Sequence, residues 1–182
     1  MSAEPWTFDL SHSSVQFHAR HLMVSKVHGR FLQWGGKLEL DSEDLTRSRI
    51  EVQIDAASIY TEEQKRDDHL RSPDFLDVAK YPQITFASKA IEKQGSDRYA
   101  VSGDLTIHGV TRPVTLDVEG GERVKDPWGG LRTGFSAKTS ISRKDFGLTW
   151  NVALETGGFL VGDKLEITLE IEAIKAAATK AA

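Results

Sequence analysis

Apolar and polar residues alternate with a period of two along most of this chain. Near its start, Val15, Phe17, Ala19, His21 and Met23 fall on one side of an extended segment. This pattern is typical of strands that bury one face, because successive side chains of a strand point to opposite sides. About eight segments show it, at residues 15–24, 32–40, 50–54, 84–86, 99–107, 114–118, 135–141 and 165–171.

About eight strands are enough to close a small antiparallel barrel that is either filled by side chains or holds one small ligand. Closure also removes the sheet edges that would otherwise pair with other chains. We therefore predict an all-β fold, an extended eight-stranded antiparallel β-barrel with short helical segments at its mouth. The chain is predicted to form one domain over residues 1–174, followed by a frayed tail at residues 175–182.

Glycine-rich and aspartate-rich stretches between the alternating segments predict hairpin connections. They lie at residues 93–97, 119–122 and 126–130. Glycines inside the segments, such as Gly36 and Gly103, predict strands that bend sharply.

The charged stretch KRDDHLRSPDFLDV, at residues 65–78, interrupts the alternation. Thr61 and Gln64 have the spacing of a capping box, which predicts a helix over residues 62–71. Serine followed by proline then predicts one further helical turn over residues 73–76. A helical segment inserted between two strands is well placed to cover one mouth of the barrel.

A second capping-box pattern, SRKD at residues 142–145, predicts another short helical turn before residues 146–151. We interpret this turn as a second segment that covers a mouth. The carboxylates of the first segment, Asp67, Asp68 and Asp74, are interpreted as a solvated and salt-bridged helix face.

The composition excludes several classes of function. The net charge of −4 offers no basic stripe for phosphates, so we expect no nucleic-acid partner. No apolar run approaches the roughly 20 residues of a membrane-spanning helix, and no cysteine is present for disulfides or thiolate chemistry. The N-terminal sequence MSAEPWTFDL has no signal-peptide pattern, which predicts a cytoplasmic protein, or a periplasmic one if a leader was removed.

Catalytic motifs are absent from the sequence, which contains neither a G-x-S-x-G elbow nor a phosphate-binding glycine loop. His18 and His21 point to opposite sides of a strand, so we expect no metal site. His21 is either a core histidine bonded to a backbone carbonyl or a group that meets the polar end of a ligand. His69 and His108 are interpreted as surface residues. We predict no catalytic residue and no cofactor other than a bound lipid.

Several motifs resemble the YceI-like polyisoprenoid-binding proteins. The resemblance runs in order from about residue 6 to residue 173. Its pieces are DLSHSSV at 9–15, GRF at 29–31, RDDHLRSPDF at 66–75, KYP at 80–82, GDLTIHGVT at 103–111 and RKDFG at 143–147. The D-x-H-L-x-S-x-D-F and GDLTIHGVT pieces are the most specific.

This resemblance implies a lipocalin-like barrel with a hydrophobic pore for a long-chain isoprenoid, of polyprenyl or isoprenoid-quinone type, or for a related amphiphilic lipid. It implies binding, storage or transport, and no catalysis. The candidate ligand-binding residues are Phe17, Ala19, His21, Met23, Trp34, Ile54, Phe75, Phe86, Leu105, Ile107, Phe135, Ile141, Phe146 and Trp150.

Two alternatives remain open at this point. One is a solid-cored barrel that acts as an interaction or stress-response protein. The other is an enzyme that uses His21 and acids near the mouth to hydrolyse or isomerise a lipid-like substrate. In addition, exposed apolar residues such as Leu22 and Val24 would allow two chains to pair, so a homodimer is plausible.

Overall fold

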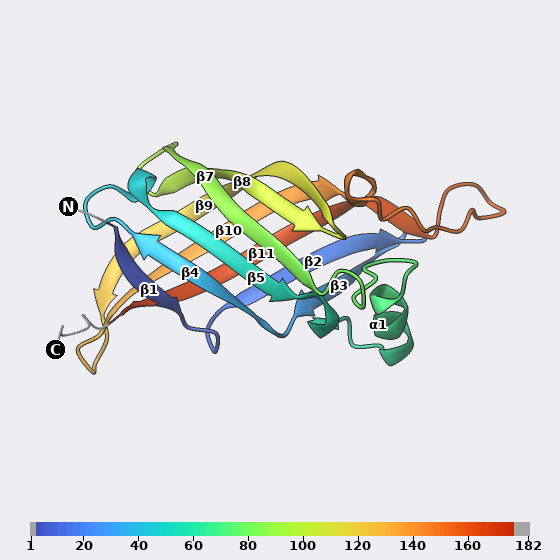
Figure 1. The fold of residues 1–182 in the computed structure, drawn as a ribbon. Helices are drawn as coiled ribbons and strands as arrows, with labels where there is room; N and C mark the ends of the chain where they lie inside the picture. Colours follow the sequence, from blue (N-terminus) through green and yellow to red (C-terminus); the bar gives the residue numbers. More distant parts are fainter. Residues whose placement is uncertain (1–2, 177–182) are drawn as a thin grey trace.

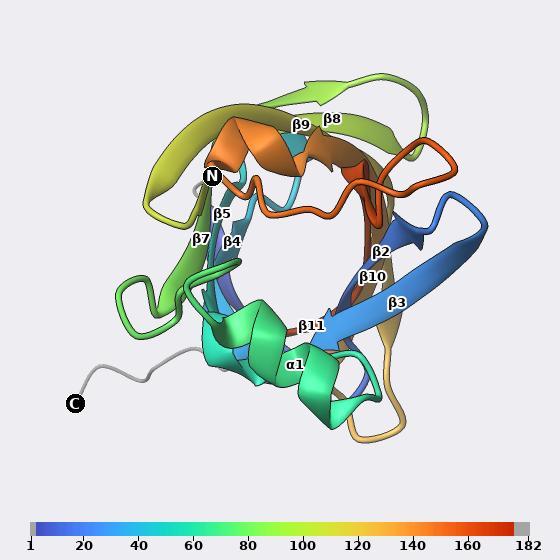
Figure 2. The same ribbon diagram turned by 90° about the vertical axis from the view of Figure 1, so that its right-hand side faces the viewer.

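Eight strands close into a ring in the order β1, β4, β5, β7, β8, β9, β10, β11, with β11 returning to β1 (Figures 1 and 2). All neighbouring pairs are antiparallel. The ring strands are β1 (Glu4–Phe8), β4 (Trp34–Leu40), β5 (Arg49–Asp55), β7 (Gln83–Lys93), β8 (Arg98–Ile107), β9 (Val110–Lys125), β10 (Leu131–Ser142) and β11 (Val161–Lys175). The computed structural model describes residues 3–176, and within them the predicted closed barrel is confirmed.

Three further strands extend the wall at one end of the ring. They are β2 (Ser14–His21), β3 (Ser25–Phe31) and β6 (Ile59–Tyr60). The long strand β11 pairs with β1 near its C-terminal end and with β2 over its N-terminal part. The β2–β3 hairpin therefore continues the barrel wall beyond the ring, on the side where the helix lies (Figure 1). The alternation did not reveal β1, β3 or β6.

The predicted strand over residues 15–24 is too long. Strand β2 ends at His21, and Leu22 and Met23 take positive φ angles of 52° and 58° in the turn to β3. Residues other than glycine, asparagine and aspartate seldom adopt this left-handed backbone conformation. The apolar residues Leu22, Met23 and Val24 therefore form an exposed hairpin tip.

The predicted hairpin at residues 119–122 is also wrong. Strand β9 runs through this stretch, where Gly120 and Gly121 have φ angles of 126° and 102°. The register with β10 shifts between Thr133 and Phe135, opposite these glycines. The stretch is thus a β-bulge, which bends the strand without ending it. Hairpins do occur at the other two predicted places, between β7 and β8 and between β9 and β10.

The helix α1 (Gln64–Arg71) confirms the expected helical segment, but its cap differs. The carboxylate of Glu63, and not the predicted Thr61, accepts the backbone N–H groups of Lys65 and Arg66. Threonine is the more usual capping residue of the two, but only Glu63 directly precedes the first turn. A further turn follows at residues 73–76.

The charges of α1 are not all solvated as the sequence suggested. Asp67 is buried, and its Oδ1 atom accepts the backbone N–H of Thr61 at 2.8 Å. Arg66 donates to the backbone carbonyl of Thr61 at 2.6 Å, and Arg71 donates to that of Ile59 at 2.9 Å. Asp67, Arg66 and Arg71 therefore fasten the helix to the chain that precedes it.

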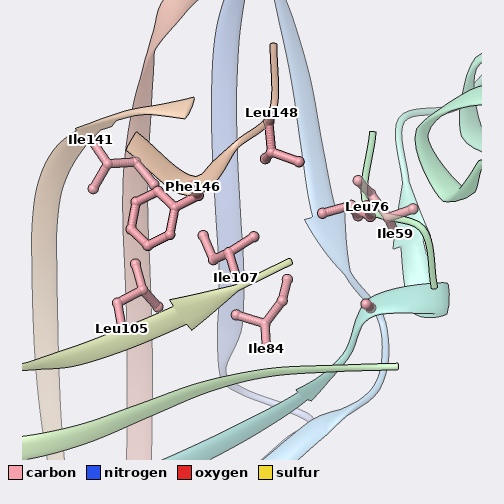
Figure 3. Packing of buried hydrophobic residues seen from close by; sticks show 9 residues of the cluster. Ile59, Leu76, Ile84, Leu105, Ile107, Ile141, Phe146 and Leu148 are labelled. Atoms are coloured by element: carbon pink, nitrogen blue, oxygen red, sulfur yellow. The ribbon is translucent and has the colours of Figure 1, made fainter. Parts of the chain in front are cut away.

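The 3-10 helix η3 (Arg143–Phe146) packs onto the same end of the barrel. Gly147, with a φ of 74°, ends it in the left-handed conformation. Phe146 lies within a buried cluster in which the side chains point toward one another (Figure 3). The cluster members are Ala56, Ile59, Leu76, Ile84, Leu105, Ile107, Ile141, Phe146 and Leu148.

The opposite end of the barrel is closed by side chains. Trp6, Phe8, Leu38, Leu40 and Ala173 form a second buried cluster there.

No helix within residues 3–176 is long and apolar enough to span a bilayer. The predicted tail begins too early, because Lys175 still pairs with Trp6 in the sheet, and its residues 177–182 lie outside the described part.

An ion-pair network joins β1, β10 and β11. Arg132 contacts carboxylate oxygens of Asp9 at 2.8 Å, Glu172 at 2.6 Å and Asp126 at 2.9 Å. Hydrogen bonds from Ser11, His12 and Arg132 lower the pKa of Asp9, and the hydrogen bond from Arg132 lowers that of Asp126.

Because these pKa values are lower in the folded than in the unfolded chain, their stabilisation is present above the unfolded pKa of about 4 and is lost as the pH falls below it. We expect the free energy of unfolding, measured with urea, to fall between about pH 5 and pH 3. Asp126→Asn is expected to flatten this slope. An unchanged slope in that variant would contradict the assignment.

Candidate ligand-binding cavity

A cavity of about 410 Å³ runs along the inside of the barrel. This volume lies in the range of about 300–1,000 Å³ that is usual for small-molecule sites. Its walls are almost entirely apolar, and it extends from Phe8, Leu38 and Leu40 at the closed end to His69 and Trp150 at the helix end. The arrangement suits the hydrocarbon part of a ligand.

Most of the candidate residues lie on this cavity. Those that line it are Phe17, Ala19, His21, Trp34, Ile54, Phe75, Phe86, Leu105, Ile107, Phe135, Ile141 and Trp150. Several of them, such as Phe17, Ile54 and Phe86, are only partly buried although they point inward. The barrel is therefore hollow, and the solid-cored alternative does not match it.

Met23 and Phe146 do not line the cavity. Met23 lies in the turn after β2, where it is 68% exposed, because the strand ends two residues earlier than the alternation suggests. Phe146 is 1% exposed and packs into the buried cluster of η3, so other side chains separate it from the lumen.

Glycines allow aromatic rings to lie flat against the wall. Phe17 pairs directly with Gly29 on β3, and a β-carbon at Gly29 would come within 2.3 Å of the Phe17 ring. A β-carbon at Gly103 would likewise come within 2.7 Å of the Phe86 ring. The strand glycines thus do more than permit bends, because they leave room for the aromatic side chains that line the cavity.

The arginine and histidine side chains of the lining lie toward the helix end. His21 closes β2 and is partly buried, and its ring has no hydrogen-bond partner within residues 3–176. The interpretation of His21 as a core histidine held by a backbone carbonyl is therefore not supported by a contact in the structure. Arg20, Thr61 and Arg66 also line this part.

Three aromatic rings meet at the helix end of the cavity. The His69 ring lies edge-on to Trp150 with centroids 4.6 Å apart, and edge-on to Phe75 at 5.1 Å. Phe75 and Trp150 are 5.2 Å apart. The Nε2 atom of His69 lies 2.8 Å from a carboxylate oxygen of Asp74. The two predicted mouth segments therefore touch each other through this aromatic cluster.

Arg143 holds the second mouth segment in place. Its guanidinium is 2% exposed and donates to the backbone carbonyls of Leu148 at 2.7 Å, Trp150 at 2.9 Å and Gly162 at 2.9 Å. Burial lowers the pKa of Arg143, and the nearby carboxylate of Asp163 partly opposes this effect. Arg143 thus ties the chain around Trp150 to the start of β11.

The sequence did not identify His69, Arg66, Thr61 or Arg143 as residues of this cavity. His69 was interpreted as a surface residue because it lies in a charged helix. The signal was available in Leu70 and Phe75, the apolar residues on either side of a helix end that faces the barrel.

A group of potential metal ligands lies away from the cavity. Ligand atoms of Asp9, His12 and Glu172 lie within 4.8 Å of one another. The guanidinium of Arg132 already contacts both carboxylates. This positive charge occupies the position in which a cation would be bound, so the group is an ion-pair network.

Similar proteins agree with this architecture. A family model described as the YceI-like domain matches residues 6–173. A UPF0312 protein of Pseudomonas savastanoi is 42% identical over 137 residues, which cover 75% of this chain and 71% of the relative. A UPF0312 protein of Pseudomonas putida is 38% identical over 164 residues, which cover 90% of this chain and 82% of the relative.

Solved structures share the barrel. BcnA of Burkholderia cenocepacia has a TM-score of 0.77 at 25% identity, covering 91% of this chain and 98% of that one. The YceI protein of Campylobacter jejuni has a TM-score of 0.75 at 33% identity, covering 87% and 90%. A polyisoprenoid-binding domain of Saccharophagus degradans has a TM-score of 0.68 at 16% identity, covering 94% and 98%, which shows the shared fold alone. Because the family model spans nearly the whole described barrel, the chain belongs to the YceI-like family.

Proposed function

We propose that this protein binds a long-chain isoprenoid, of polyprenyl or isoprenoid-quinone type, or a related amphiphilic lipid, and stores or transports it. The observation that carries the proposal is the hollow apolar cavity, with its arginine and histidine side chains at one end. The solved neighbour from Saccharophagus degradans is described as a polyisoprenoid-binding domain, which supports this class of ligand.

The binding energy would come from the hydrocarbon tail. Each methylene removed from water contributes about 0.8 kcal/mol, so affinity is expected to rise about fourfold per methylene. The rise must stop once the tail fills the cavity. Storage and transport both require this kind of reversible burial.

The function we propose is binding without catalysis. His21 is the candidate base of the enzyme alternative, yet no carboxylate that could orient its ring is among the lining residues. A catalytic base needs a partner that orients it or a substrate group within hydrogen-bond reach. Turnover of a lipid ester that disappears in His21→Ala would revive the enzyme alternative.

The function is tested by mass spectrometry of an organic extract of the natively purified protein. We expect a stoichiometric lipid with a long apolar chain. Denatured protein and an unrelated barrel are the controls. If the extract is clean, the apo-protein is titrated with isoprenoid alcohols of increasing length. Affinity that does not depend on chain length would overturn the proposal.

A further prediction concerns His21. His21→Ala is expected to weaken binding of a lipid with a polar head group by about tenfold, because a buried hydrogen bond is lost. Binding of the bare hydrocarbon with the same tail should change little. The measurement is a pair of titrations with matched ligands. Equal losses for both ligands would remove the head-group role of His21.

The cytoplasmic location and the homodimer both stay predictions. The hairpin-tip residues Leu22 and Val24, which suggested pairing of two chains, are 41% and 81% exposed. This tip lies at the same end of the barrel as α1 (Figure 2).

A further inference from the structure

Two neighbouring loops expose apolar side chains at the helix end of the barrel. Leu22, Met23 and Val24 form the tip of the β2–β3 hairpin, and Val152 and Phe159 lie in the loop before β11. We call these five residues the mouth patch. The backbone N–H of Leu22 donates to the carbonyl of Leu160 at 2.9 Å, which joins the two loops. Figure 2 shows them side by side at the rim.

The exposure of this patch is unusual for loop tips. Val24 is 81% exposed, Met23 is 68% exposed and Phe159 is 53% exposed. Leu22 and Met23 also hold positive φ angles, which are unfavourable for these residue types. Asparagine or glycine would form such a turn at a lower conformational cost. A contiguous exposed apolar patch is typical of a surface that binds another molecule or a membrane.

The outer face of the same hairpin is basic. Residues 14–31 contain Arg20, Lys26 and Arg30 together with histidines, and they contain no aspartate or glutamate. Elsewhere the chain carries an excess of acidic residues, because its net charge is −4. Positive charge is therefore concentrated on β2 and β3.

The basic residues face each other across the hairpin. Arg20 pairs directly with Lys26, and His18 pairs with His28 with ring centroids 5.2 Å apart. Like charges in directly opposed positions destabilise a sheet. Burial, with the charges of Lys26 and His28, lowers the pKa of His18, and only Glu166 on β11 acts in the other direction among its principal neighbours. A negatively charged partner would relieve this repulsion.

We propose that the β2–β3 hairpin and the loop at residues 151–160 form a docking surface for an anionic lipid bilayer. The mouth patch inserts among the acyl chains, and the basic face of the hairpin contacts the phosphate head groups. An exposed apolar tip beside basic residues is the combination that holds a protein at a membrane surface. Apolar side chains on two separate loop tips suit insertion among acyl chains, whereas a protein partner would need a complementary apolar pocket for each tip.

The position of the patch fits the cavity. His21 lines the cavity and directly precedes the hairpin tip, so the docking surface adjoins the mouth of the cavity. A barrel docked in this way places its open end against the bilayer. An apolar ligand then moves between membrane and cavity without crossing water. Docking itself does not require a filled cavity, so it can fail while the proposed lipid binding holds.

Cosedimentation with vesicles tests the docking surface. The apo-protein is mixed with vesicles of phosphatidylcholine and phosphatidylglycerol in equal parts, or of phosphatidylcholine alone. We expect binding to the anionic vesicles that weakens as salt is added. Lys26→Gln is expected to lower the partition coefficient about fivefold, and Val24→Ser about tenfold.

Matched controls lie away from the patch. Lys37 on β4 and Val124 on β9 are also exposed, and β9 reaches Val124 near the opposite end of the barrel (Figure 1). Lys37→Gln and Val124→Ser should leave vesicle binding unchanged. Thermal unfolding of each variant shows whether it is folded.

Several outcomes would overturn the inference. One is no binding to anionic vesicles by a folded protein, and another is an equal loss in the control variants. If the protein does not bind vesicles but forms a concentration-dependent dimer that Val24→Ser abolishes, the patch is assigned to a second copy of the chain. Binding to polyglutamate that Lys26→Gln weakens and Val24→Ser does not, again without vesicle binding, would assign the basic face to an acidic protein.

Discussion

Replacing Ala19 by phenylalanine is expected to reduce the affinity for a long-chain lipid on the order of 100-fold. Ala19 lines the cavity on β2 and pairs with Leu165 and Val27, which line it as well. A ring at this position would occupy the space of roughly four methylenes, each worth about 0.8 kcal/mol of burial. The loss is then about 3 kcal/mol. Isothermal titration with an isoprenoid alcohol measures it.

The matched control for Ala19→Phe is Thr168→Phe. Thr168 lies on the neighbouring strand β11 but points outward and is exposed. The added ring there meets solvent, so lipid affinity should not change. The stability of Ala19→Phe should fall little, because its ring enters an empty space and does not overpack a filled core. Unchanged affinity in folded Ala19→Phe would show that the lipid binds elsewhere.

The barrel was predictable because alternation with period two is a local signal. It is clear in the long wall strands, as in β8, where Leu105 and Ile107 were correctly placed inside. The signal does not report where a strand stops. Met23 continues the alternation of β2, but Leu22 and Met23 turn the chain into β3. One continuous pattern thus concealed a hairpin.

The hollow interior of the barrel and the contacts at its mouth could not be predicted from the alternation. A half-filled and a filled barrel show the same alternation, because both have an apolar inner face. The size of the lumen depends on how β2, β3 and β6 extend the wall, and the pairings of β2 with β11 and of β3 with β6 are not local in sequence. His69 reaches Trp150 across a separation of 81 positions, so no motif near His69 announces the contact.

The buried charges at the mouth were missed for a related reason. In the sequence, Asp67 and Arg143 look like the charged residues beside them. In the structure they bond to backbone groups that the neighbouring turns leave unpaired. These partners are backbone carbonyl and N–H groups, which almost every residue carries. The amino-acid type of the partner residue therefore does not reveal the bond in the sequence. Short helical segments at a barrel end need these bonds because they have few intrahelical ones.

Replacing Arg143 by methionine is expected to lower the free energy of unfolding by about 3 kcal/mol. Methionine keeps much of the buried volume but leaves the carbonyls of Leu148, Trp150 and Gly162 without their donor. Hydrogen bonds from a charged group contribute about 1.5–3 kcal/mol, and orphaned buried carbonyls add their own cost. For a chain of this size the melting temperature should fall by roughly 6–12 °C. Calorimetry measures both quantities.

Two further variants separate the role of the guanidinium from that of its charge. Arg143→Lys keeps a positive charge but offers no planar fork to three carbonyls, so an intermediate loss is expected. Lys144→Met removes the neighbouring exposed charge, which pairs with Asp163 at the surface, and should cost less than about 1 kcal/mol. A loss in Lys144→Met as large as in Arg143→Met would contradict the assignment.

The effect of Arg143→Met should extend to the bound lipid. Trp150 packs against Phe75 and His69, and Arg143 holds its backbone by a hydrogen bond to its carbonyl. Release of the segment would open the aromatic cluster at the mouth, so the lipid should dissociate faster while the cavity behind it keeps its apolar wall. Stopped-flow displacement of a fluorescent lipid measures this rate. A destabilised variant with an unchanged dissociation rate would show that the aromatic cluster does not retain the ligand.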